Sequence, residues 1–278
     1  MTTKLDPGKA WNDAVALLSA NMQVVLIVAG VFFFLPTAIA GIALPQPAEL
    51  EAMAASGGEP DPEAMLAVLQ GYYTSNWYWF LLLSLVQGVG MMALLALLTD
   101  SGRPTVGEAL GVGAKSVLPY FTAQLLVALF VSLVIVVLVG VGALVNVAAA
   151  ILLGLVGFVL AVYFFVKMSM IAPVIAIEKV LNPLRALQRS WALTKGNSLR
   201  LFGFYALLLL VLVVLTLLAG MLFSIFAIMG QQVGLFIEAI GGALISMATS
   251  IVMLGVLAAV HMQLSGRMTA DNTADIFD

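Results

Sequence analysis

The chain has 278 residues, of which 63% are apolar and 9% charged, and its net charge is −3. Soluble domains carry about 25% charged residues, so a chain this apolar is an integral membrane protein. Its 11 basic residues are too few and too scattered to neutralise a phosphate backbone, which excludes nucleic acid as a partner. The absence of cysteine and the single histidine, His261, exclude thiolate and multi-histidine metal sites. We therefore expect no metal and no cofactor.

Six uncharged stretches predict transmembrane helices, because about 20 apolar residues cross the hydrocarbon core. The uncharged run 116–166 is too long for one helix and predicts a hairpin that turns near Gly140–Asn146. The predicted helices cover 22–44, 77–98, 116 to about 140, about 146–166, 201–226 and 242–264. The fold class is all-α, with one membrane domain over residues 1–278.

The basic residues fall on alternate polar segments, in counts of 2, 0, 2, 0, 6, 0 and 1 along the chain. The positive-inside bias then places both termini in the cytoplasm, and we expect the bacterial inner membrane. The loop 45–76 has no basic residue and five acidic ones, which predicts an external acidic loop. Its stretch from Asp61 to Leu69 is typical of a short amphipathic helix with acidic residues at its N-terminus.

Polar-flanked segments precede every second predicted span and resemble one another. Segment 10–21 (AWNDAVALLSAN) shares four identities with segment 186–197 (ALQRSWALTKGN), and segment 109–114 is a weaker third copy. These segments follow the helix-start signals Pro7, Pro104 and Pro183, with Asp6 and Asn182 as expected caps. The pattern predicts three cytoplasmic interfacial amphipathic helices and a parallel threefold pseudo-repeat with units 1–98, 99–181 and 182–278. The alternative is chance matching within a restricted alphabet.

The stretch 168–204 reads MSMIAPVIAIEKVLNPLRALQRSWALTKGNSLRLFGF. It resembles a bacterial membrane-domain superfamily that includes the membrane region of glycerophosphoryl diester phosphodiesterases and the YciC-like inner-membrane proteins. The resemblance implies a membrane location more than a reaction. Phosphodiesterase fusions place their His, Glu and Asp residues and metal in a separate soluble barrel, for which this chain has no room. We therefore do not transfer that activity and do not expect an enzyme.

Basic residues around the third interfacial segment are candidate contacts to anionic lipid headgroups, or they merely set the topology. These residues are Lys167, Arg185, Arg189, Lys195 and Arg200. We expect Lys167, near the end of a predicted span, to extend its ammonium to the cytoplasmic headgroups. The alternative is direct contact between Lys167 and a substrate or lipid phosphate.

Glu178 follows an apolar run, and we expect it to form a structural pair with Arg185 or Arg189 that fixes the interfacial helix to the fourth span. His261, at the cytoplasmic end of the last span, is expected to be packed or interfacial.

The candidate intramembrane polar residues are Gln87, Gln124 and Asn146. Buried amides in lipid usually hydrogen-bond between helices.

These features favour a non-catalytic membrane protein with a structural or interaction role in envelope or lipid homeostasis. It would bind anionic lipid through its cytoplasmic basic helix. The alternative is a small transporter or lipid translocator with a site between the pseudo-repeats, which would need a polar cavity. A small-residue face on the last span suits internal packing or contact with a membrane-protein partner or second copy. A lipid-modifying enzyme is least favoured, because no nucleophile–base pair is evident.

Overall fold

The computed structural model describes residues 4–44, 47, 53, 61–99, 104–226 and 231–266. All regular structure within these ranges is helical, and six helices are long and apolar enough to cross a membrane, as the sequence predicts. These candidate spans are Met22–Ala43, Trp77–Thr99, Val106–Ala143, Val147–Ile177, Ser198–Phe223 and Val233–Ser265. The chain is therefore a multi-pass membrane protein. Most of the acidic loop before Asp61, together with Arg103 and Arg267, lies outside the described residues.

The chain begins with α1 (Pro7–Ala20), and the predicted cap Asp6 accepts a hydrogen bond from the Lys9 amide. The first span follows as α2 (Met22–Ala29), the π-helical turn η1 (Gly30–Phe34) and α3 (Leu35–Ala43). The widened turn ends two residues before Pro36, which has no amide hydrogen to continue the regular helical hydrogen bonding.

The acidic segment forms α5 (Pro62–Ser75), which is capped by Asp61 and confirms the predicted helix. It leads into the second span, α6 (Trp77–Thr99). The third span, α7 (Val106–Ala143), begins at a capping box of Thr105 and Glu108. Residues 106–115 run into α7 without a break, so the second of the three expected interfacial helices is not a separate element.

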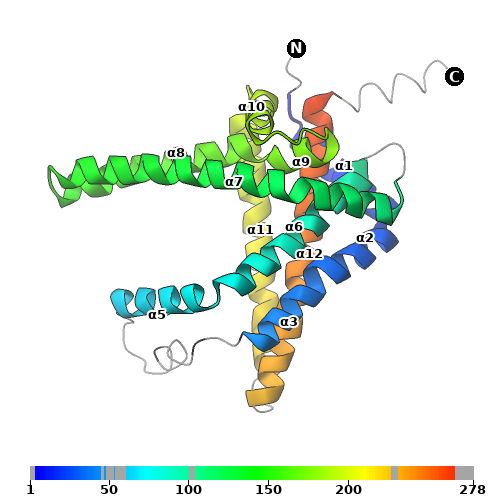
Figure 1. The fold of residues 1–278 in the computed structure, drawn as a ribbon, viewed down its shortest axis with the longest axis horizontal. Helices are drawn as coiled ribbons and strands as arrows, with labels where there is room; N and C mark the ends of the chain where they lie inside the picture. Colours follow the sequence, from blue (N-terminus) through cyan, green and yellow to red (C-terminus); the bar gives the residue numbers. More distant parts are fainter. Residues whose placement is uncertain are drawn as a thin grey trace.

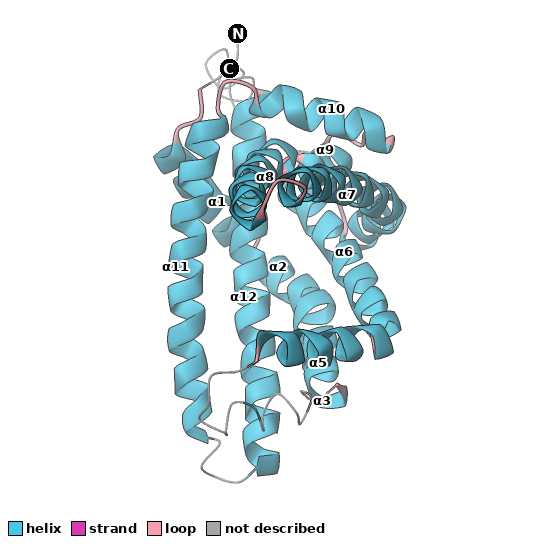
Figure 2. Ribbon diagram, turned by 90° about the vertical axis from the view of Figure 1, so that its left-hand side faces the viewer, coloured by secondary structure: helices cyan, strands magenta, loops and turns pink. Residues whose placement is uncertain are grey.

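The predicted hairpin turn is confirmed, because α7 ends at Ala143 and α8 (Val147–Met168) begins after the cap residue Asn146. Figures 1 and 2 show that this hairpin crosses the direction of the last two helices and extends sideways as an arm. The second and third hairpins therefore run in different directions, and the parallel threefold pseudo-repeat stays a prediction. Gly113 shows how closely α7 crosses α6: a Cβ added at this position would lie 2.5 Å from the Val89 carbonyl oxygen.

After α8 the chain forms the short helix α9 (Ile171–Ile177), whose seven residues are all buried. Helix α10 (Pro183–Thr194) is capped by Asn182, as predicted, and lies across the end of the molecule (Figures 1 and 2). The last two helices are α11 (Ser198–Ser224) and α12 (Gln231–Ser265). Helix α12 begins at Gln231, well before the predicted residue 242, and includes Glu238. Its 35 residues rise about 1.5 Å each, so the helix is longer than the bilayer core and extends beyond it.

The buried core lies where α1, α6, α9 and α12 meet. Its most enclosed side chains include Met92 and Leu95 of α6, Ile175 of α9, and Val256 and His261 of α12. The α7–α8 arm contributes few buried residues, and Leu144 at its tip is 87% exposed. The exposed apolar side chains of the arm are suited to contact with lipid, whereas the side chains of the core are surrounded by protein.

Candidate functional site: the charged cluster beneath the amphipathic helix

The break between α8 and α9 positions the site. The backbone turns at Ser169–Met170, which leaves the Lys167 carbonyl without its usual partner four residues ahead. The Ser190 hydroxyl of α10 donates to that carbonyl at 2.7 Å, and the Thr194 hydroxyl approaches it at 3.4 Å. Both hydroxyl residues are completely buried. The polar face of α10 that packs inward therefore supplies the hydrogen bond that the end of α8 lacks.

Glu178, at the end of α9, joins three helices. Arg189 of α10 donates from Nε to Oε2 at 2.8 Å and from Nη2 to Oε1 at 3.1 Å. His261 Nε2 of α12 lies 3.0 Å from Oε1, and because an ionised carboxylate only accepts, the imidazole donates through Nε2–H. The structure thus brings Glu178 to Arg189, one of its two expected partners, and adds a histidine that the sequence analysis did not connect to it.

The electrostatics of this cluster hold Glu178 in its charged form. Burial would raise the pKa of Glu178, but hydrogen bonds and charges from His261 and Arg189 outweigh it and lower the pKa from 4.5 to about 2. The same hydrogen bond to Glu178 raises the pKa of Arg189. At neutral pH, α9 is therefore fixed to α10 by an ion pair and to α12 by a charge-assisted hydrogen bond.

Lys167 differs from the expectation that it reaches the headgroups. Its side chain is only 3% exposed, and Nζ lies 3.4 Å from the Thr194 carbonyl oxygen at the end of α10. The ammonium also stands over the rings of Trp191 at 5.1 Å and Tyr163 at 5.6 Å. Helix α10 covers α8 at this point, so the ammonium is used inside the protein, where it faces a helix C-terminus.

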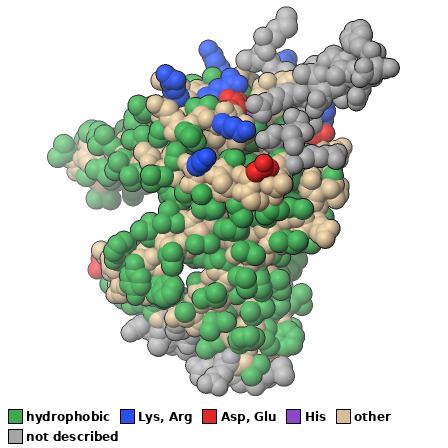
Figure 3. All heavy atoms as spheres, turned by 45° about the vertical axis from the view of Figure 1, so that its right-hand side comes forward, with side chains coloured by type: hydrophobic (Ala, Val, Ile, Leu, Met, Phe, Trp, Pro, Cys, Tyr) green, Lys and Arg blue, Asp and Glu red, His purple; other side chains and the backbone are tan. Residues whose placement is uncertain are grey.

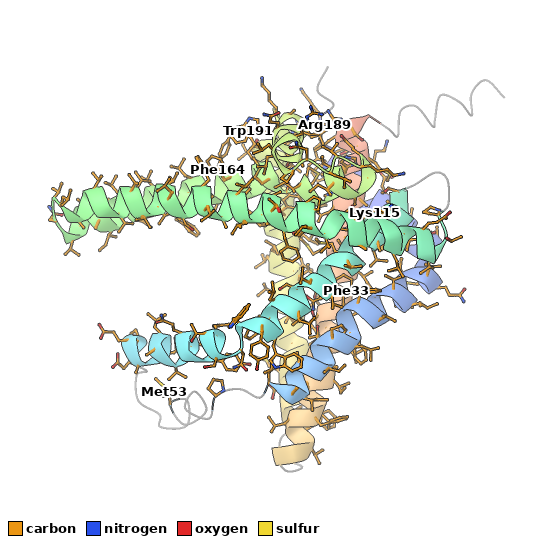
Figure 4. All side chains as sticks on the ribbon, in the orientation of Figure 1. Phe33, Met53, Lys115, Phe164, Arg189 and Trp191 are labelled. Atoms are coloured by element: carbon orange, nitrogen blue, oxygen red, sulfur yellow. The ribbon has the colours of Figure 1, made fainter. Side chains whose placement is uncertain are left out.

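Aromatic side chains close the site on the side of the arm. The Trp191 ring packs at 5.7 Å from Phe164 and 5.9 Å from Tyr163, and Phe164 in turn contacts Phe130 at 5.0 Å. Figure 4 shows Trp191 on α10 above Phe164 on α8, with Arg189 farther to the right on α10. Trp and Tyr prefer the membrane–water interface, so this cluster is suited to headgroup depth.

Basic side chains gather on the end of the molecule that carries α10 (Figure 3). Arg185 and Lys195 are exposed there, and the Arg189 side chain is 45% exposed although it also holds Glu178. Arg200 is exposed but donates from Nη1 to the Leu5 carbonyl at 3.1 Å. Three of the five predicted headgroup residues therefore have side chains exposed for contact with lipid. Arg200 is exposed but bonded to the N-terminal segment, and Lys167 is enclosed.

The N-terminal segment is held by the last two helices. The Leu5 amide donates to Asn197 Oδ1 at 2.9 Å, and the Asp6 amide donates to Gln263 Oε1 at 3.0 Å. Together with the Arg200 contact to Leu5, these bonds hold residues 5 and 6 in place, and we call the three contacts the N-terminal clasp.

The predicted intramembrane polar residues have separate local roles. Gln87 of α6 donates to the Thr37 hydroxyl of α3 at 3.0 Å and so links two helices, as expected. Gln124 bonds instead to Tyr120 of its own helix at 2.8 Å. Asn146 caps α8 at the exposed tip of the arm and accepts from Ala149 at 2.8 Å. The structure does not bring the three together.

Two apolar cavities lie where the arm crosses α11. One of about 720 Å³ is lined by α7, α8 and α11, and one of about 650 Å³ lies between α8 and the start of α11. Val162, Val166 and Phe202 line both, so the cavities adjoin and we call them together the arm groove. A smaller cavity of about 180 Å³ lies deeper, next to Tyr120, Gln124 and Ser169.

Sequence reasoning missed the inward face of α10. Ala186, Ser190 and Leu193 follow a spacing of four and three residues and are buried, whereas Leu184 and Trp191 on the same helix are exposed. The small-residue spacing was a usable signal. Within the described parts of the chain, no group of three or more His, Cys, Asp or Glu residues could hold a metal ion.

Comparison of the chain with protein-family models, with curated proteins and with solved structures finds no match. The arrangement of the site itself is therefore the basis for assigning a role.

Proposed function

We propose that this chain is a non-catalytic bacterial inner-membrane protein that binds anionic lipid through α10 and acts in envelope or lipid homeostasis. The observation that carries the proposal is the position of α10 across the basic end of the molecule (Figures 2 and 3). There, Leu184 and Trp191 are exposed beside Arg185 and Arg189. An amphipathic helix with apolar and basic residues on its outer surface is suited to the headgroup layer of an anionic leaflet.

The ion pair of Glu178 supports this role, because it fixes the orientation of α10 relative to α9. Because this ion pair anchors α10 near its centre, the basic residues of α10 stay on the outer surface of the molecule. The resemblance of 168–204 to the bacterial membrane-domain superfamily covers this same region, and membership of that superfamily is part of the proposal.

Both termini are proposed to be cytoplasmic. Because the chain has no cysteine, single cysteines at Lys9 and at Glu63 provide a clean test in intact cells. A membrane-impermeant thiol reagent added from the periplasm is expected to label the Glu63→Cys protein and not the Lys9→Cys protein. The reverse labelling would contradict the proposed orientation and would put α10 on the other leaflet.

The threefold pseudo-repeat is proposed as the origin of the fold. Its first aligned position is occupied by Ala10, Ala109 and Ala186, each with no exposed surface. The next aligned position holds Ala14, Gly113 and Ser190, which are also buried. Equivalent burial supports common ancestry of the units, although the second unit is turned sideways and has no separate interfacial helix.

Lipid binding is tested by native mass spectrometry of the detergent-purified full chain with phosphatidylglycerol and phosphatidylcholine. Each basic residue near an anionic leaflet contributes about 1 kcal/mol, so Arg185→Gln with Arg189→Gln is expected to weaken phosphatidylglycerol retention by roughly thirtyfold. Phosphatidylcholine retention should change little. The matched control is Lys9→Gln with Lys115→Gln, which removes two exposed cations outside α10. Equal retention by both double variants would contradict the proposal.

The alternative, a lipid translocator, is supported by the small cavity beside Tyr120 and Gln124, which shares Gln124 and Tyr205 with the arm groove. The Tyr205 hydroxyl, which lines both, is buried and has no hydrogen-bond partner within the described structure. Translocation of a fluorescent phospholipid in proteoliposomes, abolished by Gln124→Leu, would favour this alternative. A rate equal to that of protein-free vesicles would exclude it.

A further inference from the structure

We infer that the arm groove holds the acyl chains of one anionic phospholipid, whose phosphate lies at the junction of α10 and α11 beside Lys195. This inference rests on the proposed lipid-binding function and names the site and the class of lipid. The groove is the candidate because it lies among candidate membrane-spanning helices and has a lining that is almost entirely apolar.

The size and shape of the groove fit acyl chains. Its two parts, of about 720 and 650 Å³, meet at Val162, Val166 and Phe202. Its walls come from residues 124–131 of α7, 158–166 of α8 and 198–209 of α11. A water-filled groove of this composition would leave apolar surface hydrated, so in a bilayer hydrocarbon chains occupy it.

Two lysines without a carboxylate partner among the described residues lie near the end of the groove closest to α10. Tyr163 and Ser198 line this end, and Lys195, which is exposed, precedes Ser198 by three residues. Lys167 lies behind Tyr163, and its Nζ is 3.4 Å from the carbonyl oxygen of Thr194, the residue directly before Lys195, so both lysines belong to this corner of the molecule. Among the described residues no carboxylate forms an ion pair with either lysine, whereas Arg189 has Glu178.

A lipid phosphate supplies the missing negative charge. Placed beside Lys195, it would offset the positive charge of this corner while its acyl chains enter the groove below. The Tyr163–Trp191 contact marks this point as headgroup depth, since both residue types prefer the membrane interface. A lipid with a neutral headgroup would place its acyl chains in the same groove without that electrostatic gain, so the site should prefer an anionic lipid.

The test fills the groove from opposite walls. Val162→Trp on α8 and Ala206→Phe on α11 place bulk in the groove, and the matched controls Leu155→Trp and Leu207→Phe add the same rings on exposed positions outside it. Native mass spectrometry with phosphatidylglycerol is expected to show the most tightly retained lipid weakened at least tenfold in both groove variants and unchanged in the controls. Unchanged melting temperatures would show that the variants remain folded.

The headgroup position is tested with Lys195→Gln against Lys115→Gln. The first is expected to weaken phosphatidylglycerol about fivefold and to leave phosphatidylcholine unchanged, and the second to change neither. Wild-type retention in both groove variants, or equal effects of the two lysine variants, would overturn the inference. If the groove variants retain lipid while Arg185→Gln with Arg189→Gln loses it, the inference fails and the proposed function stands. If no variant loses lipid, both fail.

Discussion

Replacement of Glu178 by Gln tests whether the three-helix junction stabilises the fold. A pKa near 2 instead of 4.5 means that the folded protein favours the charged carboxyl by about 3 kcal/mol. Because the Arg189 side chain is 45% exposed, solvent screens part of this interaction, and we expect Glu178→Gln to lower the free energy of unfolding by about 2 kcal/mol at pH 7. The glutamine can still accept from Arg189, so the loss is mainly electrostatic.

The pH dependence of this difference identifies its source. The folded pKa of Glu178 lies below its ordinary value, so its contribution is fully present above about pH 4.5 and is lost as the pH falls toward 2. The gap between wild type and Glu178→Gln should therefore shrink by more than half between pH 7 and pH 3. Other carboxylates titrate in both proteins and cancel in the comparison.

Helix content measured by circular dichroism during denaturant unfolding in detergent gives the free energies. The matched control is Glu63→Gln, which removes an exposed glutamate from α5 and should change stability by less than about 0.5 kcal/mol. A gap of constant size at pH 7 and pH 3 would refute the electrostatic reasoning. No destabilisation at pH 7 would show that the junction does not hold α9 in place.

Three further predictions concern packing and the clasp. Gly113→Ala should destabilise the fold by about 1–3 kcal/mol, because its Cβ would press on a backbone carbonyl of α6. The control Gly111→Ala, with open space around it, should leave stability unchanged. Equal unfolding midpoints of the two variants would disprove the close crossing. Ser190→Ala should cost about 1–3 kcal/mol by leaving the Lys167 carbonyl with a weaker partner, and an unchanged midpoint would argue against that role. Gln263→Ala should speed hydrogen–deuterium exchange at residues 5 and 6, and unaltered exchange would contradict the clasp.

Local sequence signals were sufficient for the elements themselves. The caps Asp6 and Asn182 and the hairpin turn before Val147 were predictable because each depends on residues within one or two helical turns. The six spans follow from runs of apolar residues long enough to cross the bilayer. Their end points were less accurate, as with α12, because a helix continues into the polar layer without a break in its hydrogen bonds.

The arrangement of the site depends on contacts that no local pattern contains. His261 and Glu178 are 83 residues apart, and nothing in either neighbourhood indicates that they meet. The enclosure of Lys167 depends on Ser190 and Thr194 packing over it from another helix. The crossing of the arm over α6 includes the close approach of Gly113 to the Val89 carbonyl, a tertiary property that hydropathy does not measure.

The N-terminal clasp has a consequence for biogenesis. Leu5 and Asp6 are bound by side chains that lie 192 and 257 positions later in the chain. During synthesis the clasp therefore cannot be complete until the final helix, which carries Gln263, has left the ribosome and entered the bilayer. Capture of the amino end is a late event that records completion of assembly, and a bulky fusion placed immediately before residue 5 would interfere with this last step and spare the earlier ones.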